Sequence, residues 1–235
     1  MNTTLAAMHH QGLIFSANQE RGCVSEKDEP CLSSGFSALD RLLGGGWPHS
    51  GVIHLSSEPA IGEFTLLQGA LVKAREQGLV VLINPPAEPC IQWLLAQGVA
   101  PARLLILRPQ STAHALWAAE QCSRSSSCAV VWLWHQGLSF TQARRFSLAC
   151  QRSQALLVLV DYQCQSSALP VQLSMRLQQQ QQGLQITLLR QQGRFARGEV
   201  TLSKVQLWPF LRYSHRHQEP SLRPLQPAAR HYEVG

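Results

Sequence analysis

The sequence predicts an α/β protein with a largely parallel β-sheet. Short apolar strand patterns alternate with helix-length amphipathic segments along most of the chain, and this alternation is typical of βαβ units. Hydrophobic residues make up 45% of the 235 residues and charged residues only 14%, a composition that gives a sizeable core and excludes a disordered or fibrous chain. The longest apolar run, 128–134, is far shorter than the roughly 18 residues of a membrane helix. We therefore expect no membrane partner.

Three segments differ in pattern. Residues 1–32 are polar and irregular and are expected to form a flexible arm, and residues 33–208 carry the alternating pattern of a core domain. Residues 209–235 are basic, contain several prolines and show no apolar period, so we expect an extended tail.

The first half of the core has clear helix stops. Ser37 begins a short helix that Gly44 ends, because glycine adopts the left-handed conformation of a C-cap. Later helices stop at Gly78 and Gly98. The elements expected here are helices over 37–43, 64–77 and 91–97 and strands over 52–56, 79–83 and 104–107.

The second half ends in an antiparallel pattern. Ser139 and Gln142 form a capping box at the start of a helix. Two segments of period-two alternation, joined by QQGRFARG, predict a closing hairpin, and the glutamine run 178–182 is expected to be a polar loop. The elements expected here are helices over 112–123 and 140–152, strands over 129–134 and 155–160, and hairpin strands over 184–190 and 200–206.

The charge is unevenly distributed. The net charge is +6, but residues 1–100 carry 5 Lys/Arg against 9 Asp/Glu, whereas residues 101–235 carry 15 against 5. A basic, arginine-rich half indicates an acidic partner, either nucleic acid or an acidic protein face. The alternative is a solvated surface without a specific partner.

The seven cysteines form no CxxC pair. Because the N-terminus lacks an export signal, we expect free thiols in a reducing cytosol. A zinc site that uses Cys23, Cys31 or the pair His215 and His217 is the weaker alternative, since no two-by-two ligand spacing is present.

The strand–loop–helix segment 52–77 stands where an α/β nucleotide-binding protein has its phosphate loop. Such a loop needs glycines, a lysine for the outer phosphates and a Ser/Thr hydroxyl for magnesium. Here Gly62 keeps its place, Ser57 replaces the first glycine, Glu63 the lysine and Phe64 the metal ligand. A carboxylate about 4 Å from a phosphate charge costs on the order of 4 kcal/mol at an effective dielectric near 20. We therefore expect no bound ATP, no cofactor, no metal and no catalysis.

One catalytic alternative stays open. A working nucleotidase would need Thr65 as a displaced metal ligand, with Glu88 and Asp161 completing the site. Otherwise Glu63 and Phe64 simply begin a helix, and Asp161 is a cap or surface residue. His54 and His114 are interpreted as structural histidines.

The order of elements from Ser34 to about Gln206 resembles the RecA core domain. The resemblance rests on SGFSALDRLLGGGWPHSGVIHL, AREQGLVVLINPP, the stretch that ends in CAVVWLW, and the closing MRLQQQQQGLQITLLRQQGRFARGEVTLSKV. It implies a three-layer RecA-like core. RecA's P-loop Lys and Thr correspond to Glu63 and Phe64, its catalytic glutamate to the neighbourhood of Pro86, and its magnesium-binding aspartate to that of Trp134. RecA's two single-stranded-DNA loops correspond to 136–139 and 162–170, which are short here.

The lead-in GFSALDRLLGGGWP, the degenerate loop and the basic tail make the chain similar to the ImuA family of SOS-induced proteins. That resemblance implies a bacterial cytoplasmic protein that joins the nucleoid after DNA damage and serves translesion synthesis. Its implied partners are ImuB, an error-prone C-family DNA polymerase and RecA. The related cell-division inhibitor SulA resembles 64–160 nearly as well and implies the alternative, inhibition of FtsZ.

We expect the closing hairpin and tail to carry the partner contacts. Aromatic side chains and arginines are the residue types favoured at binding hot spots, and arginines also bind DNA phosphates. The alternative for the aromatic residues is packing on the chain's own core. The candidate residues are Arg190, Arg194, Arg197, Trp208, Phe210, Arg212, Tyr213 and Arg216.

Overall fold

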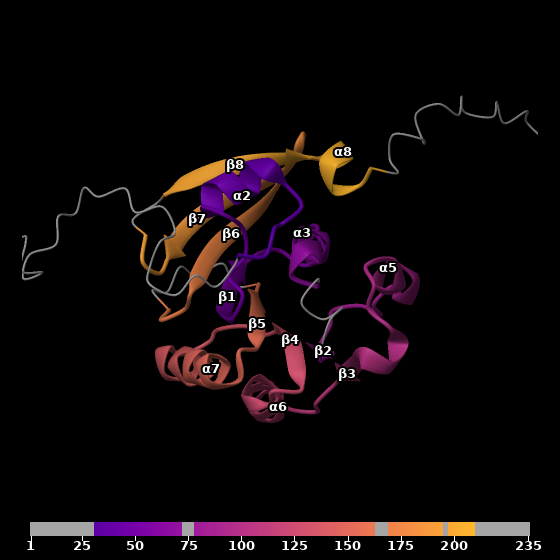
Figure 1. The fold of residues 1–235 in the computed structure, drawn as a ribbon, viewed down its shortest axis with the longest axis vertical. Coiled ribbons are helices and arrows are strands. Elements are labelled where there is room, and N and C mark those ends of the chain that lie inside the picture. Colours follow the sequence, from indigo (N-terminus) through magenta and orange to yellow (C-terminus); the bar gives the residue numbers. More distant parts are fainter. Residues whose placement is uncertain (1–30, 72–77, 163–168, 195–196, 210–235) are drawn as a thin grey trace, which may run out of the picture.

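An eight-stranded sheet of order β3-β2-β4-β5-β1-β6-β7-β8 forms the centre of the computed structural model (Figure 1). The structure describes residues 31–71, 78–162, 169–194 and 197–209, so most of the expected arm and tail lie outside the described residues. The strands are β1 Gly51–Ser56, β2 Leu79–Ile83, β3 Leu104–Leu107, β4 Cys128–Trp134, β5 Leu156–Asp161, β6 Leu173–Gln180, β7 Gly183–Gln191 and β8 Gly198–Ser203.

The sheet is parallel from β3 to β6 and antiparallel from β6 to β8. Strands β1, β4 and β5 are buried at every position, as expected for strands covered on both faces. The predicted fold class is therefore confirmed: a mostly parallel α/β sheet with a closing antiparallel hairpin.

Helices cover both faces of the sheet and give three layers (Figure 1). The apolar cluster on one face takes side chains from the first elements and from α5 and α8, and the cluster on the other face takes them from α6 and α7. The helical elements are α2 Ser37–Leu43, α3 Glu63–Leu66, η1 Gln68–Leu71, α5 Ile91–Ala96, η2 Pro101–Arg103, α6 Thr112–Arg124, α7 Phe140–Ser153 and α8 Lys204–Leu207.

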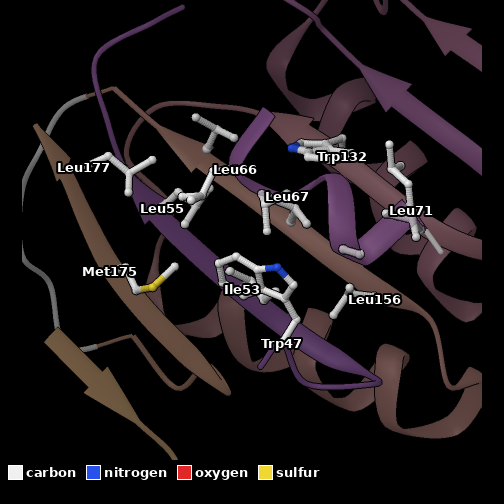
Figure 2. Close-up of a cluster of buried hydrophobic side chains, with 14 of the residues drawn as sticks. Trp47, Ile53, Leu55, Leu66, Leu67, Leu71, Trp132, Leu156, Met175 and Leu177 are labelled. Carbon is white, nitrogen blue, oxygen red and sulfur yellow. The ribbon is translucent and has the colours of Figure 1, made fainter. Parts of the chain in front are cut away.

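The larger cluster lies beneath the loop that follows β1. Figure 2 shows Leu66, Leu67 and Leu71 of α3 and η1 packed over β1, with Trp47 and Trp132 beside them. These side chains have no exposed surface. Their burial fixes the position of α3, and with it the loop before α3.

The segment before β1 closes over η1. Asp40 of α2 accepts hydrogen bonds from the backbone N–H of Ser34 and the hydroxyl of Ser33, each at 2.8 Å. The backbone of Ser33 then lies so close to Gly69 that a side chain there would meet the Ser33 carbonyl. Gly69 is thus required by a close approach between two backbones.

The expected single helix over 64–77 is wrong in its described part. The chain forms one turn of α-helix, α3, and then the 3₁₀ turn η1, with Leu67 between them. The close approach of Ser33 to Gly69 accompanies this break. Residues 72–77 lie outside the described residues.

The expected polar loop at 178–182 is also wrong. Gln178, Gln179 and Gln180 belong to β6 and pair with β7, and only the next two residues turn. Backbone pairing with β7 extends the strand into the polar glutamine run. The alternation of Leu173, Met175 and Leu177, all buried, is the signal for β6 that the expected elements left out.

The last hairpin strand ends earlier than expected. Strand β8 stops at Ser203, and Ser203 and Gln206 form a capping box that begins the short helix α8. The expected strand over 200–206 is therefore correct only in its first half. Helix α8 brings Trp208 back toward the start of the core.

Candidate functional site

The loop after β1 lies at the carboxyl ends of the parallel strands, where α/β proteins place their ligand sites. Its first residue, Ser57, donates its backbone N–H to the carbonyl of Asp161 at the end of β5, at 3.0 Å. The Ser57 hydroxyl donates to the carbonyl of Glu58, at 2.7 Å. The first of these hydrogen bonds joins the loop to the end of β5, and the second lies within the loop.

The carboxylate of Glu63 fills the centre of this loop. Its two oxygens accept the backbone N–H groups of Ala60 and Gly62, each at 3.1 Å, and the residue is only 4% exposed. Ala60 and Gly62 have positive φ angles of 61° and 113°, which turn their N–H groups toward the carboxylate. Such converging N–H groups form an anion-binding nest. Here the anion is supplied by the chain itself.

Four aromatic rings pack beside the loop where the RecA resemblance places magnesium chemistry. The centroid of Phe64 lies 5.0 Å from that of Trp93 and 4.7 Å from that of Trp132. Trp134 stacks on Trp132 at 6.2 Å with an interplanar angle of 12°. These side chains offer a cation no oxygen ligand, and magnesium binds oxygen.

The indole of Trp208 covers the loop from the C-terminal side. A Cβ atom placed on Gly62 would lie 3.1 Å from Cζ2 of Trp208. Trp208 is also packed on the larger apolar cluster. This residue, expected as a partner anchor, is thus half-buried against the chain's own loop, and whether it also binds a partner stays a prediction.

Tyr162 lies close to the loop, where the negative charge of Glu63 acts on its phenol. Burial raises the pKa of the Tyr162 phenol, and the negative charge of Glu63 raises it further. The phenol oxygen is buried and has no hydrogen-bond partner within the described part of the chain. The hydroxyl therefore stays protonated at neutral pH.

Asp161 belongs to a buried polar chain on the α7 side of the sheet. The Nε2 atom of His54 lies 3.8 Å from Oδ2 of Asp161, and its Nδ1 atom lies 3.0 Å from the hydroxyl of Ser174. All three residues are at least nine-tenths buried, so the serine is shielded from a substrate. Nearby, burial lowers the pKa of His135, and the charge of Asp161 opposes this shift.

The three residues of the nucleotidase alternative are not brought together. Glu88 is exposed and pairs with Arg108 at 2.7 Å, in a salt bridge at the surface. Thr65 lies in α3, while Asp161, at the end of β5, faces His54 of the neighbouring strand β1.

The three candidate arginines within the described residues have different surroundings. Arg190 donates to the carbonyl of Leu169 at 3.0 Å, the guanidinium of Arg194 lies against Gly44, and Arg197 is exposed. Four further candidates lie outside the described residues, namely Phe210, Arg212, Tyr213 and Arg216.

No group of three or more His, Cys, Asp or Glu within 31–71, 78–162, 169–194 and 197–209 is arranged to hold a metal ion. Cys90, Cys122 and Cys128 form no disulfide. A hydrogen bond between the thiols of Cys122 and Cys128 lowers the pKa of Cys128 to about 7 and raises that of Cys122. Cys23, His215 and His217 lie outside the described residues. None of the described helices is long and apolar enough to span a membrane.

Two contributors to this site were not expected from the sequence, namely Trp93 and Tyr162, which meet the loop only in the fold. Trp208 was expected as a partner anchor or as packing on the chain's own core, but not as the cover of this loop. The one available signal was the resemblance to RecA, which placed a tryptophan near the magnesium position and so indicated an apolar site.

Comparison with known proteins gives the fold. No family model matches the chain, and no curated protein matches it. The solved structure of the RadB recombinase is similar over 75% of this chain and 97% of its own, with 13% sequence identity and a TM-score of 0.56. SulA from Pseudomonas aeruginosa matches 47% of this chain and 97% of its own, with 26% identity and a TM-score of 0.38. The RadB likeness shows a RecA-like fold.

Proposed function

We propose that this chain is a non-catalytic accessory protein, a RecA-like core that acts as a scaffold in an SOS-induced complex for mutagenic translesion DNA synthesis. The observation that carries the proposal is the position of the Glu63 carboxylate in the loop after β1. This carboxylate accepts the two loop N–H groups and lies where a phosphate would need to bind.

Three features support the loss of nucleotide chemistry. A phosphate bound beside the Glu63 carboxylate would meet a charge of the same sign, at a cost on the order of 4 kcal/mol for each contact near 4 Å. That cost alone lowers a binding constant by about three powers of ten. In addition, aromatic rings stand where RecA has its metal ligand, and Trp208 lies over Gly62.

A core without a nucleotide switch keeps one fixed surface for partners. The partner set comes from the resemblance to the ImuA family: ImuB, an error-prone C-family DNA polymerase, and RecA as a third. We propose that these proteins contact the closing hairpin and the basic tail that follows Trp208. Arg190 and Arg197 are described and exposed members of that surface, and its arginines can serve an acidic protein face or DNA.

A pull-down with purified ImuB and the polymerase tests this proposal. Three chains are compared: the full chain, a chain ending at Pro209 and a chain ending at Gln206. The chain ending at Pro209 keeps the contact of Trp208 with Gly62, whereas the shorter one loses it. We expect the full chain to retain ImuB, with binding already lost in the chain that ends at Pro209. Nuclease treatment separates protein contact from bridging by DNA.

Full retention of ImuB by the chain ending at Gln206 contradicts the C-terminal surface. Failure of the full chain to bind ImuB, the polymerase or RecA contradicts the scaffold role altogether. FtsZ is included in the same assay, because its retention together with inhibition of its polymerisation identifies the alternative role as a division inhibitor.

A further inference from the structure

Helices α6 and α7 lie on the face of the sheet opposite α3 (Figure 1), and a groove lies between them. It is a cavity of about 270 Å³ lined by Ala113, Leu116 and Trp117 of α6 and by Gln142, Arg145 and Phe146 of α7. On α6, Ala113, Leu116, Trp117 and Glu120 follow the three- and four-residue spacing of one helix face. The groove therefore runs along both helices.

Trp117 stands out at the rim of this groove. It is 63% exposed, the highest value among the described exposed large hydrophobic side chains. The chain thus leaves a large apolar ring in water, although tryptophan gains much free energy from burial. An exposed aromatic ring beside an apolar groove is typical of a binding surface.

The exposed charged side chains at the groove are basic. Arg124 of α6 and Arg145 of α7 keep more than half of their side-chain surface exposed. Glu120 lines the groove but is buried; it pairs with Arg124 at 2.6 Å and also binds Arg145. Arg144 of α7 lines a different cavity. Two exposed guanidinium groups, one on each helix, therefore form a basic rim, and the single carboxylate of Glu120 cancels only part of their charge.

We propose that this groove binds an acidic amphipathic helix of another protein, with a large apolar side chain inserted between α6 and α7. The apolar floor of Leu116 and Phe146 suits a hydrophobic anchor, and the arginine rim suits acidic residues on both sides of it. A single-stranded nucleic acid is less suitable. Its binding depends on several cations along the backbone, whereas the groove offers two arginines that share one carboxylate.

This inference stands apart from the proposed C-terminal surface, because the groove is formed by α6 and α7 and shares no residue with the closing hairpin or the tail. Either surface can therefore fail in an experiment while the other holds.

The test uses the full chain as bait for a display library of random 16-residue peptides. We expect enrichment of peptides with net negative charge and apolar residues spaced three or four apart. The best peptide is then synthesised, and its affinity is measured by fluorescence anisotropy. A twenty-nucleotide single-stranded oligothymidine is titrated in parallel.

Ala113 offers a matched pair of variants. It is exposed in the first turn of α6 and lines the groove. Ala113→Glu is favourable to the helix dipole but repels an acidic peptide, whereas Ala113→Lys has the opposite effects. We expect at least a tenfold loss of affinity in Ala113→Glu and none in Ala113→Lys, so the result cannot be a loss of folding. Trp117→Ala is expected to weaken binding at least tenfold.

Leu95→Glu serves as the control on the other face, since Leu95 is 48% exposed on α5. It is expected to leave the peptide affinity unchanged. The proposal is overturned if no peptide is enriched, if the enriched peptides are basic or lack apolar spacing, or if Ala113→Glu binds as well as the unaltered chain. Binding of the oligothymidine that depends on Trp117, without peptide binding, would make the groove a nucleic-acid surface instead.

Discussion

At the scale of one residue, the proposed function depends on Glu63, which replaces the expected lysine and binds the backbone of its own loop. Its position predicted the loss of a lysine, but the structure adds that the carboxylate takes over the N–H groups of Ala60 and Gly62. A hydrogen bond to a charged group contributes about 1.5–3 kcal/mol, and an N–H group left unpaired in a buried place is costly. Glu63 is therefore expected to stabilise the loop that it also closes.

Replacing Glu63 by alanine tests this role. Glu63→Ala leaves the two N–H groups to water, and we expect the free energy of unfolding to fall by about 2 kcal/mol in urea denaturation. Glu58→Ala is the matched control, because Glu58 is an exposed acidic residue of the same loop, and we expect a change below about 0.5 kcal/mol. Equal losses of unfolding free energy in Glu63→Ala and Glu58→Ala would show that Glu63 acts through its charge alone and not through its two hydrogen bonds.

Tyr162 gives a prediction about pH. Because its folded-state pKa is raised by burial and by Glu63, the unfolded chain ionises first when the pH rises above about 10. Its contribution to stability is therefore complete below that pH and is lost at higher pH. In Tyr162→Phe we expect a smaller loss of unfolding free energy between pH 9 and pH 11 than in the unaltered chain.

At pH 7 the same change should cost little or be slightly stabilising, since the buried hydroxyl has no partner within the described residues. Urea denaturation at the three pH values measures both effects. A large loss of stability at pH 7 in Tyr162→Phe would contradict this and would indicate a hydrogen bond of the Tyr162 hydroxyl.

At the scale of elements, helix α8 and the loop after β1 depend on each other. Gly62 has a φ angle of 113°, and a methyl group there would press on Trp208. Gly193 also has a positive φ angle, 77°, but nothing lies within 4 Å of the place of its Cβ. The two glycines separate backbone strain from the contact with Trp208.

We expect Gly193→Ala to lower the free energy of unfolding by about 1 kcal/mol and Gly62→Ala by about 3 kcal/mol. The additional change of Trp208→Ala should relieve the difference, as a double-mutant cycle would show. Additive effects of Gly62→Ala and Trp208→Ala would mean that the indole does not hold the loop.

The elements also show what the sequence can predict. Strands β1, β4 and β5 and helices α6 and α7 were predicted within two residues at each end, because their apolar patterns and caps are local signals. The glutamines of β6 and the break between α3 and η1 were not, because strand pairing and the approach of Ser33 to Gly69 decide them. These causes join residues far apart in the chain.

The candidate site was predictable to the same extent. The substitutions at Glu63, Phe64 and Trp134 can be read from the RecA resemblance. The folded-back carboxylate depends on the φ angles of Ala60 and Gly62, and the cover depends on Trp208, well over a hundred residues away. A local pattern contains neither piece of information.

At the scale of the whole molecule, a RecA-like sheet is combined with a closed loop on one face and a basic, partly apolar groove on the other. A fold that usually changes state with a nucleotide would here present constant surfaces. The proposed role as a scaffold follows from this combination, and it requires that the chain binds no nucleotide.

The most direct test is isothermal titration of the full chain with ATP and with ADP, each in the presence of magnesium. We expect no saturable heat up to millimolar nucleotide, both for the unaltered chain and for Glu58→Ala as a control for surface charge. Saturable binding of ATP or ADP to the unaltered chain with a micromolar dissociation constant would contradict this expectation, because Glu63 would then have to leave the loop.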